Sequence, residues 1–84
     1  MTDEKAEEIE KALRELDRMF LKEQEGKIYH IMLDALDKSL IKNTLSVTFG
    51  NQIKAARLLG INRNTLRAKI KKLSIDVSKW KTNL

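Results

Sequence analysis

The sequence predicts an all-α fold in which two N-terminal helices are followed by a helix-turn-helix. The 84 residues include no proline and only three glycines, so the chain has few natural breaks. Apolar residues recur at helical spacing along most of it. Cysteine is absent, which excludes disulfides and thiolate metal sites. A chain this short buries a limited part of its surface, so we expect an additional source of stability.

The first predicted helix extends from Asp3 to Gln24 and ends before Gly26. Its apolar residues repeat at a spacing of 4, 3 and 4, which places them on one helical stripe. The segment 1–25 also holds nine acidic residues, which fit a solvated helix surface. It therefore serves either in dimerisation or as a linker. The residues of the stripe are Ile9, Leu13, Leu16 and Phe20.

A second, longer helix is predicted from Lys27 to about Thr48, within the segment 26–49. Its apolar surface is wider than a short helix-turn-helix can cover alone. Two antiparallel helices from each chain can pair with those of a second chain in a four-helix bundle. The alternative is a monomeric four-helix domain, and the small core favours the dimer. The stripe with 4, 3, 4 spacing consists of Tyr29, Leu33, Leu36 and Leu40.

The helix-turn-helix is predicted within residues 50–75. Its first helix begins at an Asn51 cap and carries an apolar stripe of Ile53, Ala56 and Leu59. Gly60 ends it, because glycine takes positive φ most easily. A short turn containing glycine between two helices is typical of this motif.

The second helix of the motif begins at an Asn62 cap, and Leu66, Ile70 and Leu73 fix one face to the core. Ile61, alone in the turn, is expected to fill the space between the two helices. Rotation by 100° per residue leaves polar and basic residues on the opposite face and at the N-terminal tip. These are Asn62, Arg63, Asn64, Arg67, Ala68 and Lys71, with Thr65 and Lys72 on one flank.

This outward face has the chemistry to bind DNA. Arginine can pair with guanine and asparagine with adenine, while threonine, lysine and helix N-terminal amides suit phosphates. A basic helix face is often only a solvated surface, but here caps, glycine turn, core stripe and basic face occur together. Charge is also divided along the chain: the net charge is −4 in residues 1–25, +1 in 26–50 and +8 in 51–84. The C-terminal part is therefore predicted to face a polyanion.

The letters GNQ followed by KAARLLGINRNTLRAKIKKL resemble the Fis-type helix-turn-helix, and the resemblance covers about Ile28 to Ile75. It implies that Asn62 and Arg63 approach base edges and that Gln52, Lys54, Thr65, Arg67 and Lys69 contact or steer the phosphate backbone. It also implies dimerisation through the N-terminal helices and bending of DNA. The sequence departs from the pattern at Ala68, where Fis-like proteins often carry lysine.

From the outward face and the resemblance together we expect two sets of contacts. Base contacts are expected from Asn62, Arg63, Asn64 and Arg67. Phosphate contacts are expected from Gln52, Lys54, Thr65, Lys69, Lys71 and Lys72.

The expected function is sequence-specific binding, as a homodimer, to pseudo-palindromic enhancer-like DNA sites. Two recognition helices related by a two-fold axis read half-sites about 34 Å apart. The resemblance implies the C-terminal domain of a bacterial NtrC-type activator, whose covalently linked ATPase domain would lie outside this chain. The alternative is a free-standing Fis-like nucleoid protein with loose specificity. A helical bundle whose basic face meets an acidic protein is a third possibility.

Other chemistry is weakly represented in the sequence. His30 is the single histidine and has no second ligand for a metal, and Asp34 and Asp37 have no nucleophile or base beside them. We therefore expect no enzyme activity, metal or cofactor. No apolar run is long enough to cross a bilayer, so a cytoplasmic, nucleoid-associated protein is expected. In the tail 76–84, Trp80 is expected to fold back onto the helical core rather than to stack on nucleic acid.

Overall fold

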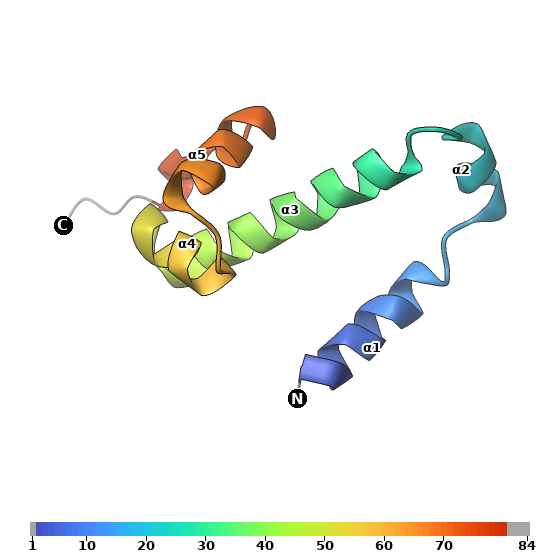
Figure 1. The fold of residues 1–84 in the computed structure, drawn as a ribbon, viewed down its shortest axis with the longest axis horizontal. Coiled ribbons are helices and arrows are strands. Elements are labelled where there is room, and N and C mark those ends of the chain that lie inside the picture. The colour runs from blue at the N-terminus through green and yellow to red at the C-terminus, as the bar shows by residue number, and fades with distance from the viewer. Residues whose placement is uncertain (1, 81–84) are drawn as a thin grey trace.

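The computed structural model describes residues 2–80, and within that range every regular element is helical (Figure 1). This confirms the all-α prediction. The helix-turn-helix gathers at the C-terminal end of the longest helix, whereas the two short N-terminal helices lie toward its other end and beside it. The elements are α1 (Thr2–Leu13), α2 (Arg18–Glu23), α3 (Ile28–Val47), α4 (Gln52–Leu59), α5 (Arg63–Lys72) and the 3₁₀ turn η1 (Val77–Trp80).

The prediction of one continuous helix from Asp3 to Gln24 is wrong, because the chain breaks between α1 and α2. Asp17 has an extended backbone, with ψ of 135°, and its side chain accepts a hydrogen bond from the Met19 amide at 3.1 Å. A carboxylate that caps a new helix competes with continuation of the old one. The four apolar residues of the expected stripe therefore do not share one helix.

The long helix α3 matches its prediction within one residue at each end, with Lys27 and Thr48 as the flanking caps. Gly26, with φ of 85°, makes the turn that precedes it. The caps predicted for the helix-turn-helix are also present. The Asn51 side chain accepts from the Lys54 amide at 3.0 Å, and the Asn62 side chain accepts from the Asn64 amide at 2.7 Å.

α3, α4 and α5 end in the same way, with a left-handed residue after the helix. These residues are Phe49 (φ 54°), Gly60 (φ 75°) and Ser74 (φ 53°). In each case the next amide bonds to a carbonyl five residues earlier, at 2.8, 3.1 and 3.0 Å respectively. This pattern satisfies carbonyls that a helix end would otherwise leave open. Only one of the three positions carries glycine, so the other two are conformationally strained.

Replacing Ser74 by glycine should raise the free energy of unfolding by about 0.5–1 kcal/mol, because the left-handed conformation costs a side-chain-bearing residue more than glycine. The urea midpoint should rise while the slope of the transition stays unchanged. Gly60→Ala is the matched control and should act in the opposite sense. A Cβ added at Gly60 would meet no atom within 4 Å, so its cost is conformational alone. Loss of stability in Ser74→Gly would contradict the interpretation.

The buried core lies entirely in the second half of the described chain. The C-terminal half of α3 packs against α4 and α5, and Ile75 covers one side after α5 ends. Leu59, Ile61, Ile70 and Leu73 pack around this centre, as the helix-turn-helix pattern predicts. The fully buried or nearly buried residues are Ile41, Leu45, Ala55, Ala56, Leu66 and Ile75.

The C-terminal segment closes the core, as predicted for Trp80. Val77 and Trp80 are partly buried against the core cluster. Hydrogen bonds from the Ser78 hydroxyl and amide to Asp76 Oδ1, at 2.6 and 3.0 Å, begin the 3₁₀ turn. Those two bonds, together with the positive charge of Lys79, hold the pKa of the Asp76 carboxyl below its ordinary value. Residues 81–84 of the predicted tail lie outside the described range.

Candidate nucleic-acid interface

The N-termini of α4 and α5 meet at one open surface. A shallow depression of about 400 Å³ is lined by Gly50, Asn51, Gln52 and Ile53 from the start of α4 and by Arg63 and Arg67 from α5. Gln52, Arg63 and Arg67 were predicted from the sequence to bind DNA, and the fold brings them together here. Two guanidinium groups beside a helix N-terminus make a surface suited to anions. Gly50 and Asn51 line the depression because they lie in the turn before α4.

Ile53 corrects the predicted core stripe of α4. Its side chain is 51% exposed and lines the depression, whereas Ala55 and Ala56 are buried. The helix therefore turns its small residues toward α3 and α5. Small side chains let helices approach closely, so α4 packs through alanine rather than through the larger isoleucine. Ile53 then provides an apolar contact beside the two arginines.

The cap formed by Asn62 competes with the base contact predicted for the same side chain. Its side-chain oxygen already accepts the Asn64 amide at 2.7 Å, which caps α5. A bidentate contact with adenine uses both the amide oxygen and the amide nitrogen of an asparagine. The cap leaves the side-chain nitrogen of Asn62 free to donate a hydrogen bond. Arg63 is not a cap residue.

The outward face of α5 is open, as the sequence predicts. Leu66 points into the core with no exposed surface, which fixes the orientation of the helix. The residues on the opposite side and on its flank are all exposed, and so is Lys54 on α4. The exposed residues of α5 include Asn64, Thr65, Arg67, Ala68 and Lys71.

Two of the lysines predicted to contact phosphate also form ion pairs with α3. Lys69 Nζ lies 2.8 Å from Asp37 Oδ2, and Lys72 Nζ lies 3.6 Å from Asp34 Oδ1. Both pairs join α5 to α3, and the Lys69 pair is the shorter and less exposed of the two. Neither ion pair was predicted from the sequence. An ion pair between residues 32 positions apart leaves no local signal in a sequence.

Lys69 and its neighbour Lys71 should therefore behave differently when replaced by alanine. Lys69→Ala should lower the free energy of unfolding by about 0.5 kcal/mol, since a partly exposed ion pair is worth roughly 0.2–1 kcal/mol. Lys71→Ala should leave stability within about 0.5 kcal/mol of the parent and should weaken binding to duplex DNA more. Urea denaturation and DNA titration at one salt concentration measure the two effects. Indistinguishable variants in both measurements would show that the ion pair does not hold α5.

The residues expected to form a dimer interface lie on the surface of a single chain. α1 and α3 together line an apolar groove of about 340 Å³, which Ile9, Leu13, Leu33 and Leu36 help to form. Tyr29 is 71% exposed at one end of this groove, and Leu40 is 44% exposed further along α3. Leu16 and Phe20 are half-buried: Leu16 lies in the break between α1 and α2, and Phe20 lies on α2.

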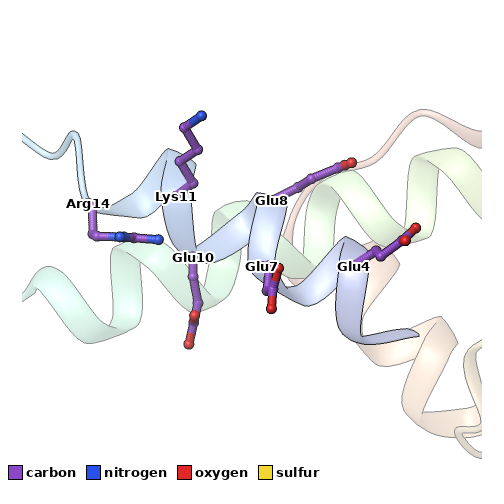
Figure 2. A pocket seen from close by; sticks show the side chains of 6 residues that line it. All are labelled: Glu4, Glu7, Glu8, Glu10, Lys11 and Arg14. Carbon is purple, nitrogen blue, oxygen red and sulfur yellow. The ribbon is translucent and has the colours of Figure 1, made fainter. Parts of the chain in front are cut away.

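The acidic side of α1 does not form a comparable site. Figure 2 shows that Glu4, Glu7, Glu8 and Glu10 point in different directions and do not converge. All four are exposed, in keeping with a solvated helix surface. Among residues 2–80, no group of three or more histidines and carboxylates is arranged to hold a metal ion.

Comparison with known proteins identifies this arrangement. The family model described as "Bacterial regulatory protein, Fis family" matches residues 32–73, which include most of α3 and all of α4 and α5. The chain belongs to the Fis family. This confirms the resemblance seen in the sequence, and it places the chain among regulatory proteins rather than enzymes.

Relatives of two kinds share this Fis-family sequence. The "DNA-binding transcriptional regulator NtrC" of Azospirillum brasilense is 56% identical over 50 residues, which are 60% of this chain and 10% of that protein. The "DNA-binding protein Fis" of Mannheimia haemolytica is 34% identical over 80 residues, covering 86% of this chain and 82% of that protein. A "DNA-binding protein Fis" of Buchnera aphidicola is 43% identical over 51 residues, covering 61% and 52% respectively.

The chain spans about a tenth of the length of the NtrC relatives and most of the length of the Mannheimia Fis protein. No solved structure matches it. None of the helices that the structure describes has the length and apolar character needed to cross a membrane.

Proposed function

We propose that this chain is a homodimeric, sequence-specific DNA-binding domain that reads pseudo-palindromic, enhancer-like sites. One observation carries the proposal: Arg63 and Arg67 project from the exposed tip and outer face of α5 into the same depression as the N-terminus of α4. The first helix of the motif can then hold phosphates while the second presents its arginines to base edges.

The ion pairs between α5 and α3 bear on which side chains are available to contact DNA. Arg63, Asn64 and Arg67 read bases, with Asn62 donating from its amide nitrogen. Gln52, Lys54, Thr65 and Lys71 hold the phosphate backbone. Lys69 is engaged by Asp37 at 2.8 Å and is partly buried, so its contribution to DNA binding is mainly the position of α5, whereas Lys72, with a side chain that is 70% exposed, stays among the phosphate contacts.

Dimerisation is part of the proposed function. The apolar groove between α1 and α3 and the exposed leucines beside it leave apolar side chains open to solvent in a single chain. A second copy of the chain would cover this surface in a four-helix arrangement and set the spacing of the two recognition helices. If that spacing is less than one helical turn of DNA, the duplex bends to reach both.

The parent protein in this proposal is an NtrC-type activator. The identity of 56% with an NtrC protein over 50 residues supports it. The domain would tether the activator at its sites, while a linked ATPase domain would drive promoter opening. A specific observation favours the second candidate, a Fis-like nucleoid protein, because the match to the Mannheimia Fis protein covers 86% of this chain.

The specificity ratio separates the candidates. The chain is titrated at fixed salt against a duplex that it selects from random sequences and against unselected duplex of equal length. A site-specific regulator prefers its site by about 10³ or more. A ratio near one would favour the nucleoid protein. Absence of duplex binding even at low salt would overturn both DNA-binding proposals and favour a protein partner for the basic face.

A further inference from the structure

The C-terminal turn η1 lies beyond the segment that matches the Fis family model, yet it contacts α3 and lies against Gly50, which precedes the α4 cap Asn51. Ile75 is 7% exposed, and Val77 and Trp80 pack against the core cluster. The Asp76 carboxylate, bonded twice to Ser78, fixes the conformation of the turn. This segment is therefore an integral part of the folded unit.

The backbone of Trp80 lies directly against Gly50. A Cβ built on Gly50 would be 3.0 Å from the carbonyl oxygen of Trp80 and 3.1 Å from its carbonyl carbon. Gly50 also has a φ of 82°. Glycine is required here for two reasons: it adopts a positive φ without strain, and its lack of a Cβ leaves room for the backbone of η1.

The turn that η1 contacts is strained. Phe49, with φ of 54° and a side chain that is 74% exposed, directly precedes Gly50, so two successive residues adopt left-handed conformations. A bulky residue persists in such a conformation only where the surrounding structure holds it. Trp80 is the neighbour that covers Gly50, and the exposed Phe49 side chain gains little packing of its own.

We infer that Trp80 is a positioning residue for DNA binding: η1 braces the strained turn before α4 and thereby fixes the N-terminus of α4 against the phosphate backbone. The inference rests on the proposed function. Asn51 and Gln52 follow Gly50 immediately and line the depression with Arg63 and Arg67. Displacement of the turn would move these α4 residues relative to the arginines of α5.

Trp80→Ala tests the brace at a temperature where circular dichroism shows that the helices remain formed. Affinity for the selected duplex should fall about tenfold, and the effect of Lys54→Ala should shrink in this background, because both changes act on α4. Residues that act through one another show such non-additivity, whereas distant ones do not. Lys71→Ala, near the other end of α5, should keep its full effect. Trp80→Phe should restore most of the binding.

Asp76→Ala provides an independent test that removes no core side chain. It weakens the hydrogen bonding of η1 but also removes a negative charge, so electrostatics alone predicts tighter DNA binding. If η1 braces the turn, the affinity of Asp76→Ala for the selected duplex should instead fall about two- to threefold. Trp80 is the only tryptophan of the chain, so a red shift of its fluorescence would report release of η1 in this variant.

Failure of the proposed function would appear as absence of duplex binding by the unmodified chain. The outcomes below concern the brace alone. Undiminished binding by Trp80→Ala would overturn the brace. So would additive effects with both lysine variants, or tighter binding by Asp76→Ala. Lys79→Gln removes the charge that lies 5.1 Å from the Trp80 ring centre and should leave affinity within about twofold. A loss as large as that of Trp80→Ala would show direct contact with DNA instead of bracing.

Discussion

Leu36→Glu should convert the proposed dimer into a folded monomer and weaken binding to the selected site by about 100-fold or more. Leu36 lies on α3, is 45% exposed in the single chain and lines the apolar groove with Ile9 and Leu13 of α1. A carboxylate at this position would have to be desolvated in the dimer. Loss of the partner removes the second half-site contact, and linked binding can contribute 10²–10⁴ to affinity.

Sedimentation velocity and DNA titration of the same preparation measure both parts of this prediction. Leu58→Glu is the matched control, because Leu58 is 63% exposed on α4 and does not line the groove. It introduces the same carboxylate and should leave the association state unchanged. A Leu36→Glu chain that still sediments as a dimer would mean that another surface forms the interface.

Arg63→Ala should cost about 1–3 kcal/mol of binding to the selected site and relax the base preference at one position in each half-site. Arg63 begins α5, is exposed, and lines the depression beside α4. The loss of affinity in Arg63→Ala should depend on the DNA sequence, because the guanidinium pairs with a base edge only where the correct base is present.

Lys54→Ala is the comparison for Arg63→Ala. A phosphate contact carries no sequence information, so affinity should fall equally for all duplexes, and the salt dependence should lose about one unit of slope. Titrations of both variants at several salt concentrations, against selected and random duplex, distinguish the two roles. If each variant reduced binding to the two duplexes by the same factor, the assignment of Arg63 to base reading would be refuted.

Much of the helix-turn-helix could be predicted from the sequence, because its signals are local. Asn51 and Asn62 are cap residues by type, Gly60 suits a left-handed turn, and Leu66 marks the face that is buried. Each of these features depends on neighbours within a few residues. The family model therefore matches the part of the chain where local signals agree with the fold.

The errors arise where a regular pattern competes with a local bond or with contacts across the fold. The 4, 3, 4 apolar spacing suggested one N-terminal helix, but the Asp17 cap interrupts it. Ile53 has helical spacing with Ala56, yet close packing of α4 favours the alanines. The partner of Lys69 is Asp37, on another helix, and only the tertiary structure brings them together.

The position of the buried core has a consequence for gene control. Within residues 3–80 the six buried residues lie between Ile41 and Ile75, so the helix-turn-helix shares a core with α3 that does not depend on the proposed dimer interface. At low protein concentration, dissociated chains would then remain folded monomers, each with one helix-turn-helix. Well below the dissociation constant of the proposed dimer, the dimer concentration would rise with the square of the total protein concentration, so a modest change in expression would produce a larger change in site occupancy.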